Sequence, residues 1–248
     1  MSKVLLIGES CMDIFIYGNT PRLSPEGPAP VFNPTNERYN GGMALNVQSN
    51  LESLGVDVDI ITHNSTITKT RFVHESSNTL LLRVDEGDEV NQIDINTLPS
   101  DYWEYDMVVI SDYNKGFLSN EDIANIAFNH PITICDTKKK LGEWCRDLKF
   151  IKLNRTEYLN NQTFISDNEW IVEKLIITLD KDGCKHNGVM YPTEKVEIMD
   201  ISGAGDTFVA GFTTKYIESS DVIESIKFGN NCASQVVQKR GVTIITKT

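Results

Sequence analysis

The sequence is poor in basic residues and has no long apolar run. Its 23 lysines and arginines face 35 aspartates and glutamates, and the net charge of the 248 residues is −12. Surfaces that bind nucleic acid or anionic membranes need a basic footprint, so this composition argues against both partners. No apolar segment approaches the length that spans a bilayer. The short run at residues 4–7, closed by Gly8, predicts a first strand rather than a signal peptide. We therefore expect a soluble, cytoplasmic protein.

Cysteine and histidine are scarce and scattered. The five cysteines and four histidines show neither metal-ligand spacing nor a disulfide framework. Free thiols are therefore expected, and a zinc site is not. Low-complexity sequence is also lacking, while 40% of the residues are hydrophobic, enough for a sizeable core. The length fits a single domain over residues 1–248.

The most informative stretch reads Asp-Ile-Ser-Gly-Ala-Gly-Asp-Thr at residues 200–207. Polar and apolar residues alternate before it, at residues 195–198, and predict a half-buried strand. Apolar residues recur every four positions over residues 204–216 and predict a helix. A strand, a glycine turn and a helix together direct backbone amides towards an anion. Gly203 and Gly205 lack a Cβ, so a phosphate could approach the main chain closely there.

Asp206 is the unexpected residue of this stretch. A carboxylate beside an anion site repels the anion unless it has a chemical task. Such a task is to accept the proton of a hydroxyl that attacks a phosphoryl group. The alternative is that Asp206 only complements the helix dipole, as acidic residues in a first turn often do.

The rest of the chain alternates apolar strands with helical patterns. The expected strands lie at residues 4–7, 56–61, 107–110, 132–135, 150–153 and 175–179, and the expected helices begin near residues 44, 120, 204 and 221. Polar residues follow four of these strands, beginning at Ser111, Asp136, Asn154 and Asp180. The carboxyl ends of parallel strands meet at one edge, where open α/β sheets bind ligands. The sequence thus predicts an α/β fold with a doubly wound, mostly parallel sheet.

Two segments break this pattern and predict a small β-rich lid, at about residues 12–40 and 66–86. Five prolines exclude a helix from the first segment, and the second contains two runs rich in β-forming residues. Lys69 and Arg71 share a strand face, which Arg83 could join from the next strand. Three basic groups in one patch could hold a substrate phosphate, or they could protect a strand edge by charge.

A second candidate ligand site lies near the N-terminus. Asp13 follows the first strand and could accept hydrogen bonds from sugar hydroxyls, although a solvated loop aspartate fits as well. Gly41 and Gly42 precede a predicted helix that carries Asn46 near its start. The glycines would let the backbone approach a ligand while Asn46 presents its amide, but such a pair also fits a simple turn.

Three motifs in this order resemble a known family. Residues 200–207 match the C-terminal signature of the ribokinase-like (PfkB) carbohydrate kinases, residues 41–46 resemble the start of its N-terminal signature, and Asn-Arg-Thr-Glu at residues 154–157 resembles its N-x-x-E motif. Further segments are similar to those of the D-glycero-β-D-manno-heptose 7-phosphate kinases within this family, at residues 22–31, 66–71, 82–85 and 111–116.

The resemblance implies a ribokinase-like fold and a kinase that uses ATP and Mg²⁺ to phosphorylate a sugar or sugar phosphate. It makes Asp206 the general base and places the anion hole at Gly203, Ala204 and Gly205. The implied substrate-binding residues are Asp13, Gly41, Gly42, Asn46, Lys69, Arg71, Arg83 and Asp112. The implied nucleotide-binding residues are Asn154, Arg155, Thr156, Glu157, Thr178, Asp180, Gly183, Ser202 and Asn230, with Asn154 and Glu157 organising the metal. A homodimer through the lid is a further expectation.

The sequence also departs from the family pattern. About two dozen residues of a strand–helix–strand passage are missing near residue 62, and Asp-Thr-Lys-Lys at residues 136–139 replaces a more usual Asp-Pro-Lys-Gly. These departures leave two alternatives to the heptose phosphate reading. One is a PfkB kinase for another sugar or a nucleoside, and the other is a catalytically silent protein that binds a sugar or a nucleotide.

Overall fold

The apolar runs of the sequence form the central sheet of an α/β body. The structure, a computed structural model, describes residues 2–246. The strand order is β12-β11-β10-β9-β8-β7-β1-β4. The strands are β1 (Lys3–Gly8), β4 (Asp57–Ile61), β7 (Met107–Asp112), β8 (Thr133–Thr137), β9 (Phe150–Asn154), β10 (Leu175–Thr178), β11 (Cys184–His186) and β12 (Val189–Tyr191). The run from β4 to β10 is parallel, whereas β11 and β12 are antiparallel. The predicted doubly wound, mostly parallel sheet is confirmed.

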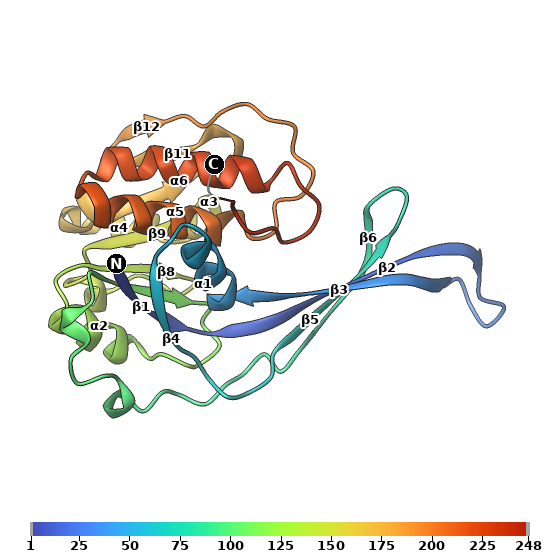
Figure 1. Cartoon of the computed structure of the whole chain (residues 1–248), viewed down its shortest axis with the longest axis horizontal. Helices are drawn as coiled ribbons and strands as arrows, with labels where there is room; N and C mark the ends of the chain where they lie inside the picture. The colour runs from blue at the N-terminus through green and yellow to red at the C-terminus, as the bar shows by residue number, and fades with distance from the viewer. Residues whose placement is uncertain (1, 247–248) are drawn as a thin grey trace.

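Helices cover both faces of this sheet, as Figure 1 shows. Because successive strand residues point to opposite faces, Leu5 of β1 packs in the cluster that contains α2, and Leu6 packs in the cluster of α1, α5 and α6. The helices are α1 (Ala44–Ser53), α2 (Asn120–Asn129), α3 (Arg155–Asn160), α4 (Gln162–Asp167), α5 (Ala204–Ser219) and α6 (Val222–Val236). Short 3₁₀ turns are η1 (Ile95–Thr97), η2 (Tyr102–Glu104), η3 (Glu143–Cys145), η4 (Glu169–Lys174) and η5 (Asp180–Asp182).

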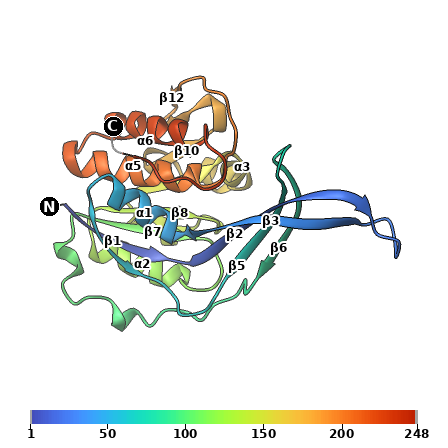
Figure 2. The same ribbon diagram turned by 45° about the vertical axis from the view of Figure 1, so that its right-hand side comes forward.

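The lid is a second sheet that projects from the body (Figure 2). Its strands, in the order β3-β2-β5-β6, are β2 (Ser10–Leu23), β3 (Pro30–Met43), β5 (Thr68–His74) and β6 (Thr79–Glu86). The sequence suggests only short extended pieces in the first lid segment, but β2 and β3 form a long antiparallel hairpin. Prolines are tolerated there because β3 is an edge strand and β2 is bulged between Asn19 and Arg22.

The predicted strand at residues 195–198 is wrong, because this segment has no ladder partner and runs as irregular chain. Two short strands precede it instead, and β12, the last of them, ends that edge of the sheet. The turn between β11 and β12 is Asn187-Gly188, with positive φ at both residues. Asn-Gly is a strong hairpin signal, so the β11–β12 hairpin could have been found from the sequence.

The shortened passage near residue 62 leaves β4 at the other edge of the body sheet. Only residues 62–67 connect β4 with the lid strand β5. The chain therefore passes from β4 of the body to β5 of the lid without an intervening helix or strand. Among the described residues 2–246, no helix combines the length and the apolar character that crossing a membrane requires.

Candidate active site

The N-terminus of α5 is built as an anion site. Gly203 precedes the helix with φ of 80°, a left-handed conformation, and within the described chain no side chain caps this end. A Cβ on Gly203 would lie 2.6 Å from Nδ2 of Asn46, and one on Gly205 would lie 3.0 Å from Nζ of Lys152. Glycine is therefore required for close packing as well as for φ. The amide of Ala204 donates to the carbonyl of Ile201 at 3.2 Å, whereas those of Gly203 and Gly205 have no such partner in the described chain and are left for an anion, whose charge the helix dipole favours.

Asp206 lies in the first turn of α5 and is 7% exposed. Its Oδ2 accepts a hydrogen bond from Nδ2 of Asn46 at 2.9 Å, and its Oδ1 accepts one from the hydroxyl of Tyr113 at 2.8 Å. Burial raises the pKa of the Asp206 carboxyl, against the opposing effect of these two hydrogen bonds. A fixed carboxylate with a raised pKa is suited to accept a proton from an alcohol.

A buried ion pair lies beneath the glycine turn. Nζ of Lys152, on β9, lies 2.9 Å from Oδ2 of Asp136, on β8, and their side chains are 4% and 7% exposed. The other oxygen of Asp136 is buried and has no hydrogen-bond partner among the described residues. The Lys152 ammonium sits close to Gly205, as the distance above shows. It therefore adds positive charge where a phosphoryl group would meet the amides of α5.

Glu9 holds the loop that carries Tyr113. This fully buried carboxylate follows β1 and accepts hydrogen bonds from the backbone amides of Tyr113, Lys115 and Phe117, at 2.8, 3.0 and 3.3 Å. Burial, and then the neighbouring Asp206 carboxylate, raise the pKa of Tyr113 well above its usual value. Tyr113 thus stays protonated and donates to Asp206 as a positioning residue.

The predicted sugar-binding residues gather where β2 and β3 leave the body. Oδ1 of Asp13 is ion-paired with Nη1 of Arg71 at 2.5 Å. A Cβ on Gly42 would lie 2.1 Å from Oδ2 of Asp13, so only glycine fits beside this carboxylate. Gly41 precedes it on β3, and Asn46 links this corner to Asp206. Buried Lys69 places its Nζ 5.3 Å from the centre of the Tyr113 ring.

Two predicted substrate-binding residues are engaged elsewhere in the structure. Arg83 lies opposite Arg71 on the same lid face, as the sequence suggests, but it forms a double hydrogen bond with Asp85 at 2.7 and 2.8 Å. Asp112 is fully buried and accepts hydrogen bonds from Oγ1 of Thr137 at 2.5 Å and Nζ of Lys139 at 3.1 Å. Their roles towards a substrate remain predictions.

Asn154 and Glu157, the predicted metal residues, bond to each other. Their side chains form a reciprocal capping box at the start of α3, and Glu157 also accepts a hydrogen bond from the ammonium of Lys138. Despite burial, the charges of Asp136 and Glu157 raise the pKa of Lys138. With both carboxylate oxygens accepting N–H donors, this pair fits contact with Mg²⁺ through its water shell rather than direct ligation. No cluster of three or more His, Cys, Asp or Glu that could hold a metal occurs in residues 2–246.

The other predicted nucleotide-binding residues lie around β10, α3 and α6. Arg155 contacts Asp182 at 2.7 Å and Asp180 at 3.7 Å, which brings the α3 and η5 segments together. Nδ2 of Asn230, on α6, donates to the carbonyl of Tyr191 at 2.9 Å. The remaining predicted positions are Thr156 in α3, Thr178 at the end of β10, Gly183 with φ of 92° after η5, and Ser202 beside the glycine turn. Their contacts with a nucleotide remain predictions.

The sequence pattern assigns no site role to Lys152, Tyr113 or Glu9, and it places Asp136 only at the predicted ligand-binding edge of the sheet. Lys152 had a visible signal, since it is a lysine inside the otherwise apolar run at residues 150–153. A buried lysine needs a partner, and Asp136 ends the neighbouring strand. Tyr113 and Glu9 carry no such signal, because the contact between them depends on how β1 and β7 pair.

Comparison with known proteins agrees with this geometry. Residues 105–248 match the model of the pfkB family carbohydrate kinases. The chain belongs to this family. Membership indicates a sugar kinase, for which ATP is the usual phosphoryl donor, and it confirms the resemblance found in the sequence motifs.

Individual relatives and structures agree with the family assignment. The bifunctional protein HldE of Helicobacter pylori strain J99 is 29% identical over 97% of this chain, which spans 64% of that relative's length. Ribokinase from Thermotoga maritima superposes with a TM-score of 0.73 at 16% identity, covering 98% of this chain and 95% of the other. Ribokinase from Arabidopsis thaliana, complexed with ribose and ATP, has a TM-score of 0.71 at 14% identity, with 97% and 94% covered. The solved structures establish the ribokinase-like fold of this pfkB chain.

Proposed function

We propose that this pfkB-family kinase transfers the γ-phosphoryl group of ATP to D-glycero-β-D-manno-heptose 7-phosphate and yields the 1,7-bisphosphate. The observation that carries the kinase chemistry is the position of Asp206. It combines a buried carboxylate, two hydrogen-bond donors that orient it, and the amides of Gly203 and Gly205 beside it at the start of α5. The four segments that resemble heptose 7-phosphate kinases, and the similarity to the proteins named HldE, support this acceptor.

Asp206 would act as the general base. Its carboxylate accepts the proton of the acceptor hydroxyl as the hydroxyl oxygen bonds to the γ-phosphorus, and the bond from that phosphorus to the leaving ADP oxygen breaks. The amides of Gly203 and Gly205, with the ammonium of Lys152, would stabilise the negative charge on the transferred group. The amide of Ala204, also expected from the family resemblance, donates to the carbonyl of Ile201 in this structure. Asn46 and Tyr113 keep the carboxylate aimed at the acceptor. Mg²⁺, when bound with ATP, would neutralise phosphate charge near Asn154 and Glu157.

The sugar would lie between the body and the lid. Asp13 can accept hydrogen bonds from its hydroxyls, and the amide of Asn46 can donate to them. Gly42 lets the backbone approach the sugar. Aromatic residues of β2, Phe15 and Tyr17, stack on each other on the lid face that turns towards the body. Closure of the lid over the sugar would exclude water and so favour transfer over hydrolysis of ATP.

Two alternatives are kept because the acceptor rests on sequence similarity. A PfkB kinase for another sugar or a nucleoside would use the same Asp206 chemistry with different lid contacts. A silent binding protein would keep the fold and lose turnover. The complete set of catalytic contacts around Asp206 favours an enzyme.

The deciding experiment is ATP consumption by the purified protein with a panel of acceptors: heptose 7-phosphate, fructose 6-phosphate, ribose and nucleosides. Turnover confined to the heptose phosphate, and abolished in Asp206→Asn, is the expected result. Turnover on another acceptor would retain the mechanism and reject the substrate. ATP binding without turnover on any acceptor would favour the binding protein.

A further inference from the structure

The arginines fall into two groups, those that pair with a carboxylate and those that do not, and two of the second group line one cavity. Of the seven arginines in the chain, four pair with carboxylates. Among the residues that the structure describes, the other three have no carboxylate partner, namely Arg22, Arg38 and Arg240. Two of these, Arg38 and Arg240, line the same cavity. Two neighbouring guanidinium groups without a carboxylate partner are unusual in a chain of net charge −12.

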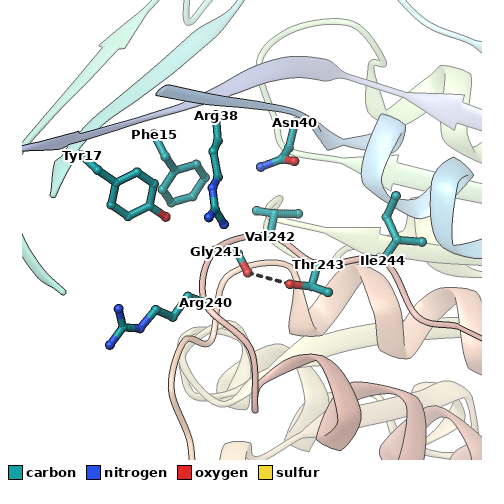
Figure 3. Close-up of a pocket in the computed structure, with 9 residues that line it drawn as sticks. All are labelled: Phe15, Tyr17, Arg38, Asn40, Arg240, Gly241, Val242, Thr243 and Ile244. Carbon is teal, nitrogen blue, oxygen red and sulfur yellow. Dashed lines mark hydrogen bonds between the residues drawn. The ribbon is translucent and has the colours of Figure 1, made fainter. Parts of the chain in front are cut away.

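This cavity lies between the lid and the loop that follows α6 (Figure 3). Its volume is about 270 Å³. The lid contributes Phe15, Tyr17, Arg38 and Asn40, and the loop contributes residues 240–244. Figure 3 shows the guanidinium of Arg38 directed from β3 towards the loop, with the Tyr17 hydroxyl beside it. Arg240 extends from the opposite wall below Tyr17, and its side chain is exposed.

The cavity borders the proposed acceptor site on two sides. Cγ1 of Val242, in its wall, lies 3.4 Å from where a Cβ on Gly203 would be, so the wall touches the glycine turn of α5. Asn40, in the opposite wall, is the ladder partner of Asp13. A sugar with one hydroxyl at Asp206 and others at Asp13 would therefore point its far end towards Arg38 and Arg240.

We propose that this cavity binds the phosphate group that the acceptor already carries, with Arg38 and Arg240 as its anion ligands. The proposal rests on the proposed kinase function and assigns the residues that would hold the phosphate of a sugar phosphate acceptor. Guanidinium groups bind phosphate through paired charge-assisted hydrogen bonds. Arg38 lies over the ring of Tyr17, with its Cζ 5.5 Å from the ring centre, and neither Arg38 nor Arg240 has a carboxylate partner among the described residues that would compete with a phosphate. Arg71 and Arg83, predicted from the sequence for this task, already bind Asp13 and Asp85. Asp200, near the loop, is bonded to the amides of Ser202 and Gly241 and lines the neighbouring cavity instead.

The test measures binding of heptose 7-phosphate, fructose 6-phosphate and their unphosphorylated sugars by calorimetry, without nucleotide. The variants are Arg38→Gln and Arg240→Gln, with Arg22→Gln as the matched control, because Arg22 is also unpaired but lies outside the cavity. Each cavity variant is expected to weaken binding of the sugar phosphate by about 10-fold or more, and to leave the unphosphorylated sugar unaffected. Arg22→Gln should bind within about twofold of the wild type, as a solvated arginine would. Inorganic phosphate should compete with the sugar phosphate in the wild type.

Binding and turnover separate this proposal from the proposed function. Weaker sugar phosphate binding in both cavity variants supports the phosphate site, even if no acceptor is turned over and the kinase function fails. Wild-type affinity in the cavity variants overturns the phosphate site, even if turnover supports the kinase. The site is equally overturned if the wild type binds neither sugar phosphate, or if it binds the sugar and its phosphate with equal affinity.

Discussion

The catalytic end of the body and the lid differ in how deeply their charged and polar residues are buried. At the catalytic end, charged and polar groups are buried, and Asp206, Lys152 and Tyr113 are each held by a specific partner. In the lid, by contrast, Arg83 and Asp85 pair at the surface, and Leu82 is 55% exposed. Burial holds the catalytic side chains in one geometry, whereas the exposed side chains of the lid are less constrained in position. Under the proposed function, the body would set the type of reaction and the lid would largely set the choice of acceptor.

The largest effect is expected from Asp206→Asn, which removes the base and keeps the shape. Turnover should fall by about 10²–10⁴-fold, the usual contribution of a general base, while ATP still binds. Steady-state kinetics and nucleotide binding by calorimetry would measure the two effects. Loss of ATP binding along with turnover would instead indicate that the substitution disrupts the α5 turn.

The same substitution makes a prediction about stability. Burial raises the folded-state pKa of Asp206 above its unfolded value, so the folded protein holds this proton to higher pH than the unfolded chain does. The stability from this group is present at low pH and declines as pH rises from the unfolded pKa through the folded pKa. At neutral pH the ionised carboxylate costs stability, and Asp206→Asn should unfold at an equal or higher temperature than the wild type. A lower unfolding temperature would contradict this account.

The two ion pairs offer a second contrast. Lys152→Met leaves Asp136 buried without its partner and should lower the free energy of unfolding by about 3–5 kcal/mol. Arg83→Met breaks the exposed lid pair with Asp85 and should cost at most about 1 kcal/mol. Denaturant unfolding of both variants tests the difference. Similar costs for the two would mean that the Lys152–Asp136 pair is hydrated in solution.

The sequence predicted the body better than the lid for a physical reason. Apolar runs such as residues 107–110 specify buried strands by composition alone, and residues 200–207 specify a local turn. The contacts of Asp206 with Asn46 and Tyr113 join residues 160 and 93 positions apart. No local pattern predicts such contacts: the Gly-Gly turn made Asn46 a candidate ligand residue, but nothing in the sequence paired it with Asp206. The length of the lid hairpin was not predicted, because its prolines argue against strands although an edge strand tolerates them.

Glycine substitutions separate backbone strain from site geometry. Gly203 and Gly188 both have positive φ, but a Cβ on Gly188 meets nothing within 4 Å, whereas one on Gly203 meets Asn46. Alanine at either position should cost about 1–2 kcal/mol of stability from strain. Only Gly203→Ala should also displace Asn46 from Asp206 and lower turnover, on the order of 100-fold. Equal turnover in the two variants would show that Asn46 does not position Asp206.

Tyr113→Phe tests the orientation of the base. The Tyr113 hydrogen bond lowers the pKa of Asp206, so its removal should raise that pKa further. The acid limb of the profile of kcat/KM against pH should then move to higher pH, with a loss of about 10-fold at the optimum. An unchanged acid limb would show that a group other than Asp206 controls it.

The smallest effect on stability is expected at the outer face of the lid. There Leu82 lies opposite Phe72, with Ile16 next along the sheet. The ring of Phe32 packs edge-on against Phe72, and Leu82 is 55% exposed. Leu82→Ser should change the free energy of unfolding by less than about 0.5 kcal/mol, as should Leu159→Ser on α3, which is also 55% exposed. The two should differ in assembly. If the lid joins two copies, as we propose, the wild type and Leu159→Ser should sediment as dimers, and Leu82→Ser should shift towards monomer because it removes apolar contact area from this face. A monomeric wild type would reject the lid dimer.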